Sequence, residues 1–176
     1  AHLSWAASYD EMTGHLNRLR LRERLAHHME DLPTAERKPV VYCVVAIDDL
    51  AVINETYGFD TADEVIVAVG RRLAEAGGAK CAVGRTAGNK FGIILGDCGR
   101  AAMHVAAERF IKSVREATIK TTACQLSATI SIGGVMLPEQ ARTTYQALSQ
   151  SLLALERAKL KPYDCFMAFE PSPARE

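Results

Sequence analysis

The strongest structural signal in the sequence is a continuous apolar run, VVYCVVAI, at Val40–Ile47, in which β-branched residues predominate. A strand with one face in solvent alternates apolar and polar residues, whereas a strand covered on both faces does not. The run therefore predicts the central strand of a sheet that is packed on both sides. It is also far shorter than the roughly 20 residues needed to cross a bilayer.

The remaining pattern predicts helices and further strands around this centre. Apolar residues at helical spacing indicate helices near residues 16–28, 65–73, 103–114 and 145–155, and the second ends at Gly77 and Gly78, a pair suited to a C-terminal cap. Residues 80–85 and 91–95 read as strands joined by a hairpin turn at Gly88 and Asn89, which both tolerate a positive φ. Period-two patterning over residues 126–136 predicts a strand with one buried face, and residues 165–169 a last strand. The expected class is α+β, a mainly antiparallel sheet with helices packed on its faces.

The composition disfavours several classes of partner and location. Lysine and arginine together number 21, as do aspartate and glutamate, so no long-range field favours nucleic acid or an anionic membrane. The N-terminus shows no secretory signal pattern. The five cysteines are scattered and form no C-x-x-C pair, which favours reduced thiols and a cytoplasmic location.

Several segments, in order and at matching spacing, resemble the GGDEF domain of bacterial diguanylate cyclases. Residues 10–18, DEMTGHLNR, are similar to its opening D-x-L-T-G-L-x-N-R. Residues 47–63, IDDLAVINETYGFDTAD, resemble D-I-D-x-F-K-x-I-N-D-x-x-G-H and the following G-D. Residues 85–91, RTAGNKF, take the place of R-x-G-G-D-E-F, and residues 129–133 and 158–159 resemble the later T-x-S-I-G and A-K. The resemblance implies the palm-like fold of nucleotidyl cyclases.

Active members of the family join two GTP molecules into cyclic di-GMP on two facing domains, with divalent metal. The resemblance implies that this chain has lost most of the carboxylates for that reaction. Ala46 stands where active relatives have the first aspartate of D-I-D, and Asp48, on the same strand face, remains as a weak candidate for a metal ligand. Asn89 and Lys90 replace the two acidic residues of the hairpin, so an amide and an ammonium stand where magnesium prefers anionic oxygen.

Other replacements in the same signature affect phosphate binding. Ala87 replaces the first glycine of the turn and Gly88 keeps the second, so the degenerate motif of the hairpin reads Ala87, Gly88, Asn89 and Lys90. Ala51 stands in place of a family lysine and Tyr163 in place of a phosphate-binding arginine. The family's product-inhibition site is absent, because Gly78 and Cys81 occupy its arginine and aspartate positions.

The base-recognition positions are retained. Asn54 and Asp63 match family residues that hydrogen-bond the guanine edge, and Lys159 could meet a phosphate as a point charge. The alternative interpretation is that Asn54 and Asp63 merely cap the helices that follow them. GTP is therefore the expected ligand if one binds, with magnesium bound weakly or not at all.

These observations support three hypotheses. The first is a catalytically degenerate GGDEF domain that acts as a regulatory or dimerising module in cyclic di-GMP signalling. The second is a GTP-binding allosteric domain that controls an attached EAL phosphodiesterase, and the third is an active cyclase that uses Asp48 and Asp49. We expect a leader at residues 1–9 that continues an upstream sensory helix, the domain at 10–169, and a linker at 170–176 towards an EAL domain. A homodimer is a candidate assembly, whereas nucleic acid and membrane are not expected partners of this domain.

Overall fold

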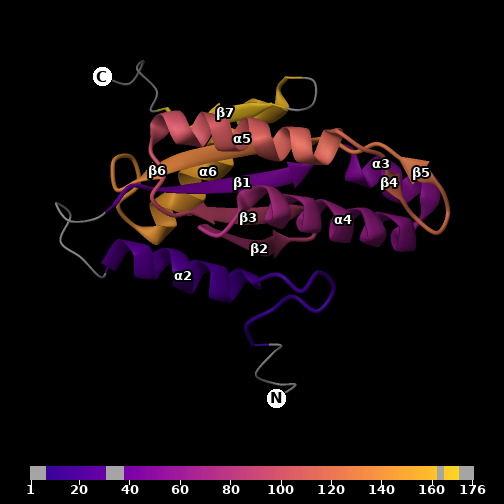
Figure 1. The fold of residues 1–176 in the computed structure, drawn as a ribbon, viewed down its shortest axis with the longest axis horizontal. Helices are drawn as coiled ribbons and strands as arrows, with labels where there is room; N and C mark the ends of the chain where they lie inside the picture. The colour runs from indigo at the N-terminus through magenta and orange to yellow at the C-terminus, as the bar shows by residue number, and fades with distance from the viewer. Residues whose placement is uncertain (1–6, 31–37, 162–164, 171–176) are drawn as a thin grey trace.

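The computed structural model describes residues 7–30, 38–161 and 165–170. Its main feature is a five-stranded sheet with the strand order β2-β3-β1-β6-β7 (Figure 1). The strands are β1 (Val40–Ile47), β2 (Cys81–Ala87), β3 (Lys90–Leu95), β6 (Ile130–Leu137) and β7 (Phe166–Ala168). Neighbouring strands run antiparallel except for β6 and β7, which are parallel. The mainly antiparallel sheet and the central position of residues 40–47 are as the sequence predicts.

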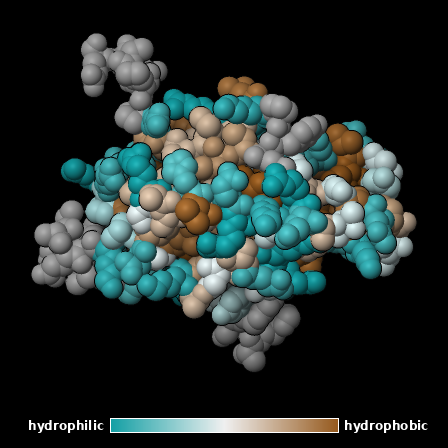
Figure 2. Space-filling model, turned by 45° about the horizontal axis from the view of Figure 1, so that its top comes forward, coloured by the Kyte–Doolittle hydropathy of each residue, from teal (hydrophilic) through white to brown (hydrophobic). Residues whose placement is uncertain are grey.

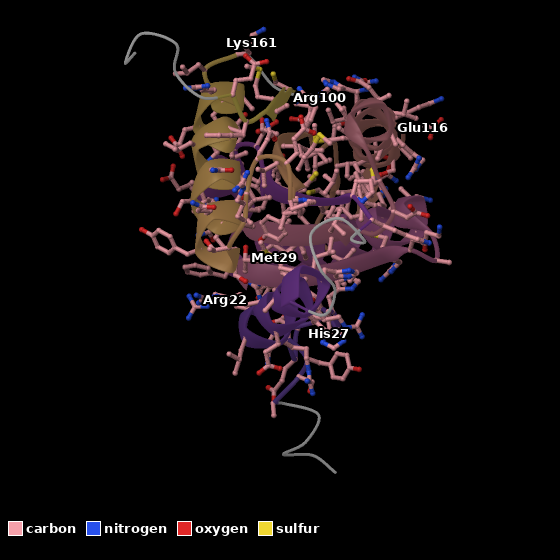
Figure 3. The ribbon with its side chains drawn as sticks, turned by 90° about the vertical axis from the view of Figure 1, so that its left-hand side faces the viewer. Arg22, His27, Met29, Arg100, Glu116 and Lys161 are labelled. Carbon is pink, nitrogen blue, oxygen red and sulfur yellow. The ribbon has the colours of Figure 1, made fainter. Side chains whose placement is uncertain are left out.

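Helices cover both faces of this sheet. They are α2 (Arg18–Glu30), α3 (Leu50–Tyr57), α4 (Phe59–Gly77), α5 (Arg100–Arg115) and α6 (Thr144–Lys159). Figure 3, seen along the sheet, places α5 and α6 on opposite sides of it, with α2 at one end. A separate two-stranded hairpin, β4 (Ile119–Lys120) and β5 (Gln125–Leu126), follows α5.

The two faces of β1 contribute to two separate hydrophobic clusters. Val41, Cys43 and Val45 pack in the cluster with α4 and α5. Tyr42, Val44 and Ala46 pack in the cluster with α2 and α6. All eight residues of β1 are buried, because each face of the strand has a helix layer over it.

Strand β6 differs from the prediction of one buried face. Residues 126–136 divide between β5 and β6, and all of β6 is buried. The residues that alternate with the apolar ones are Ser131 and Gly133, which are small enough for α6 to lie directly on them. A β-carbon at Gly133 would overlap the backbone of Leu155 and Ser151 in α6. The pattern therefore marks close helix packing, and the expectation of a solvent face was wrong.

Helix α6 buries small residues where the sequence predicts large ones. Tyr145 and Leu152, part of the predicted apolar stripe, are 76% and 43% exposed. The buried positions of the helix are Leu155, which belongs to the predicted stripe, and four small residues, Ala147, Ser151, Ala154 and Ala158. The first predicted helix also differs from the prediction. It begins at Arg18, and Leu19, expected on its apolar face, is 62% exposed. Close approach to the glycines of β6 selects small side chains on the inner face of α6.

The surface and the state of the cysteines can be compared with what the composition predicts. On the face shown in Figure 2, hydrophilic residues spread over most of the surface, and hydrophobic residues form small groups between them. No helix in the described parts of the chain has the length and apolar character required to cross a membrane. All five cysteines are free thiols.

Candidate nucleotide site

A pocket of about 1090 Å³ lies where β1 ends. Its wall is formed by the exit of β1, helix α3, the first turns of α4, the β2–β3 turn and the residues at the end of α6. Asp49 turns the chain from β1 into α3 with a left-handed φ of 57°, and Gly58 joins α3 to α4 with a φ of 94°. These two conformations suit an aspartate and a glycine, and they hold the two helices at the end of the sheet where β1 stops.

The polar residues singled out from the sequence converge on this pocket. Its lining includes Asp48, Asn54, Asp63, Asn89 and Lys159. They come from segments more than 100 residues apart, and the strand order brings the segments together because β1 lies between β3 and β6. Of the degenerate hairpin positions, Gly88 and Asn89 line the pocket.

Neither Asn54 nor Asp63 caps a helix. Asn54 lies inside α3, whose N-cap is Asp49, and Asp63 lies inside α4, whose N-cap is Gly58. The capping interpretation of these two residues is therefore wrong. Both residues line the pocket, and the structure gives neither side chain a hydrogen bond to another described residue. An amide and a carboxylate can together pair with the acceptor and donor groups of a purine edge.

Asp48 is held by two hydroxyl groups of the neighbouring strand segment. The Thr129 Oγ1 donates to Asp48 Oδ2 and the Ser131 Oγ donates to Asp48 Oδ1, each at 2.7 Å. Ser131 is paired with Ala46 across β1 and β6, so Asp48 does lie on the face of Ala46, as expected. Both carboxylate oxygens of Asp48 are thus engaged within the protein.

The β2–β3 turn places Lys90 beside Ala46. Lys90 is the register partner of Ala46 across β3 and β1, and its Nζ donates to Asn89 Oδ1 at 3.3 Å. The backbone N–H of Ile47 donates to the carbonyl of Asn89 at 3.2 Å, which fixes the turn against the end of β1. Ala87 is exposed, and the register shifts between Arg85 and Ala87. The hairpin is therefore formed at the predicted residues.

Arg85 and Asp10 brace this turn, an interaction that we did not predict from the sequence. The Arg85 guanidinium lies 3.4 Å from both Asp10 oxygens, and its other terminal nitrogen donates to the Gly88 carbonyl at 3.0 Å. Asp10 is itself fixed by the backbone N–H and hydroxyl of Thr13, at 3.0 and 2.8 Å. Each residue falls in one of the segments that resemble the family, DEMTGHLNR and RTAGNKF, but the two lie 75 positions apart.

A divalent metal does not fit the residues present. The described residues include no group of three or more histidine, cysteine, aspartate or glutamate side chains that could hold a metal ion. The oxygens of Asp48 already accept short hydrogen bonds, and the ammonium of Lys90 lies at the same end of the pocket, where it would repel a cation. Asp48 is therefore better described as a structural hydrogen-bond acceptor than as a metal ligand.

The remaining predicted positions lie near or outside the site. Ala51 lines the pocket, and Tyr163 lies outside the described residues. Gly78 ends α4 with a φ of 75°, and Cys81 begins β2. Neither residue supplies a guanidinium or a carboxylate for binding cyclic di-GMP.

The family is established by comparison with known proteins. The family model described as "Diguanylate cyclase, GGDEF domain" matches residues 7–164. The chain belongs to the GGDEF family, which confirms the assignment made from the motifs.

A curated relative indicates the setting in which such a domain occurs. The chain is 25% identical over 159 residues to the cyclic di-GMP phosphodiesterase NbdA of Pseudomonas aeruginosa, which covers 90% of this chain and 20% of that protein. The chain therefore spans about a fifth of the length of this relative.

Two solved structures from Pseudomonas aeruginosa share the fold. The GGDEF domain of YfiN superposes with a TM-score of 0.85 at 23% identity, covering 91% of this chain and 99% of that one. The diguanylate cyclase SiaD, solved with its activator SiaC, gives a TM-score of 0.84 at 27% identity, covering 95% of this chain and 64% of that one. The predicted palm-like α+β fold is confirmed.

Proposed function

We propose that this chain is a catalytically inactive GGDEF domain that serves as a regulatory module of a larger cyclic di-GMP signalling protein. The observation that carries the proposal is the row formed by Lys90, Ala46 and Ser131 across β3, β1 and β6. The family resemblance implies that, in active members, this end of the sheet holds the metal that activates GTP. Here the row presents an ammonium, a methyl group and a hydroxyl group, and none of these is an anionic oxygen that could hold such a metal ion.

The relatives support the signalling context. NbdA is a cyclic di-GMP phosphodiesterase and SiaD is a diguanylate cyclase that was solved with an activator, so domains similar to this chain occur on both sides of cyclic di-GMP turnover. We infer that the chain acts in cis on a neighbouring domain, with an EAL phosphodiesterase as the first candidate and a sensory domain upstream.

A second proposal concerns how the domain regulates. The side chains of Asn54 and Asp63 line a pocket large enough for a nucleotide and are not used as helix caps. We infer that the pocket binds a guanine nucleotide, and that binding shifts the activity of the attached domain. For that shift, the nucleotide must bind one conformation of the full-length protein more tightly than the other.

The proposal of inactivity is tested with the purified domain, GTP and Mg²⁺. We expect no cyclic di-GMP by chromatography, and a cyclase of the family assayed in parallel provides the positive control. Cyclic di-GMP that forms from this chain and disappears in Asp48→Ala would instead identify an active cyclase. The regulatory proposal predicts that Asn54→Ala and Asp63→Ala abolish the response of the full-length protein to GTP.

A further inference from the structure

The charges around the pocket are unusual for a metal-dependent nucleotide site. Three acidic residues line it, Asp48, Asp49 and Asp63, and three basic residues balance them, Arg85, Lys159 and Lys161. Lys90 adds a fourth cation, because its ammonium lies 3.3 Å from the side chain of the lining residue Asn89. The end of the pocket near the β2–β3 turn therefore carries positive charge that belongs to the chain itself.

The position of Lys90 is fixed by the sheet. Residues that are paired across antiparallel strands have their β-carbons roughly 5 Å apart, so Lys90 and Ala46 are direct neighbours on one face. Ala46 is 1% exposed and carries only a methyl group. Ser131, on the other side of Ala46, directs its hydroxyl hydrogen to Asp48. The long side chain of Lys90 thus has only small neighbours in its row and can extend towards the pocket.

The carboxylates at this end are not arranged to bring in a metal. Asp48 accepts two hydrogen bonds of 2.7 Å, and Asp49 is exposed at the N-terminus of α3. Asp63 lies on α4 and is, with Asn54, one of the two residues suited to a base edge. The positive charge that a phosphate group requires must therefore come from the basic side chains.

We propose that the pocket binds a guanine nucleotide without a divalent ion, and that the ammonium of Lys90 meets its phosphate groups. This inference rests on the proposal that the pocket binds a nucleotide at all. Lys159, the last residue of α6, and Lys161, just beyond it, supply further charge to the pocket lining. An ammonium is a point charge with three donors, which suits a phosphate oxygen without the fixed geometry that a metal demands. Because no metal ion activates the bound nucleotide, it is not converted to product. In the proposed function it acts as an allosteric signal.

Calorimetric titration of the isolated domain with GTP, in EDTA and in excess Mg²⁺, tests this proposal. We expect wild-type protein to bind GTP in EDTA, and Mg²⁺ to leave the affinity unchanged or to weaken it. Lys90→Gln should weaken binding in EDTA by about tenfold or more, since it removes a charged contact. Lys90→Arg, which keeps the charge, should retain most of the affinity.

Two controls separate this effect from a loss of structure. Lys120→Gln removes the same charge from an exposed position in β4, and GTP affinity should stay at the wild-type value. The thermal midpoint of Lys90→Gln should match that of Lys120→Gln. Both variants leave Asn54 and Asp63 intact.

The possible results distinguish the two proposals. Binding that requires Mg²⁺, or equal affinity of Lys90→Gln and wild type in EDTA, would overturn the role of Lys90 while leaving the nucleotide pocket in place. Wild-type protein that binds GTP in neither condition would overturn both proposals. The regulatory role of the domain would then have to operate through protein contacts.

Discussion

The hydroxyl group of Ser131 donates a 2.7 Å hydrogen bond to the carboxylate of Asp48, linking the exit of β1 to β6. Thr129 donates a second bond of 2.7 Å to the other oxygen. Hydrogen bonds to a charged acceptor in a partly buried place contribute more than neutral ones. This carboxylate, which resembles part of a catalytic motif, therefore stabilises the wall of the pocket.

Asp48→Asn should lower the free energy of unfolding by about 1–3 kcal/mol, because one carboxylate acceptor becomes an amide donor beside two hydroxyl groups. Urea denaturation measures this loss. Asp60→Asn, at an exposed position in the first turn of α4, should change stability by less than about 0.5 kcal/mol. Equal stability of the two variants would mean that the hydroxyl contacts contribute little.

The close packing of α6 on β6 gives a second prediction. Gly133→Ala should destabilise the domain by about 1–3 kcal/mol or more, because the new methyl group would overlap the backbone of α6. Gly88→Ala is the matched control, since a β-carbon there meets no heavy atom within 4 Å. Thermal and urea unfolding should show a clear loss for the first variant and a small change for the second. A tolerated Gly133→Ala would show that α6 can move away from the sheet without cost.

The brace between Arg85 and Asp10 can be measured by a double-mutant cycle. Both side chains are largely buried, with exposed fractions of 19% and 22%. Arg85→Ala and Asp10→Ala should each destabilise the domain, and the double variant should show a coupling energy between about 0.5 and 3 kcal/mol. The cycle Lys80→Ala with Asp97→Ala, at an exposed ion pair of 3.0 Å, should show weaker coupling. Additive effects of the two substitutions would show that the Arg85–Asp10 ion pair does not contribute to stability.

His15 makes the stability dependent on pH. Burial lowers the pKa of His15 below its usual 6.5, although Asp10 and the backbone of Gly70 act in the opposite direction. The unfolded state therefore binds a proton more readily, and the contribution of His15 is present above pH 6.5 and lost as the pH falls below it. Wild-type protein should lose more stability than His15→Gln between about pH 7.5 and 5.5. Parallel curves for the two proteins in chemical denaturation would contradict this assignment.

The fold was predictable to the extent that each segment has a pattern of its own. The run at Val40–Ile47 gives the central strand because strands buried on both faces lack polar alternation, and Met103, Phe110 and Val114 mark the buried stripe of α5. The pattern failed where small residues, rather than large apolar ones, form a buried interface. Gly133 and Ser151 lie at the interface of α6 with β6, and residue size alone does not distinguish such an interface from solvent.

The site was predictable only through motif resemblance. Lys159 is far from Asn54 and Asp63 in the sequence, and no periodicity indicates that the three line one pocket. The brace from Asp10 to Arg85 and the two hydroxyl groups on Asp48 are long-range contacts, which depend on the strand order. The choice between helix caps and pocket residues also required the observed helix boundaries.

Recognition of guanine by the pocket can be measured by comparing the binding of GTP and ATP in calorimetry. We expect the isolated domain to bind GTP at least about tenfold more tightly than ATP, since a site built to pair with a base edge rejects a base with the wrong donors and acceptors. Asn54→Ala and Asp63→Ala should remove this preference, whereas the exposed-surface variant Lys120→Gln should keep it. Equal affinity for the two nucleotides, or no heat with either, would show that the pocket does not recognise guanine.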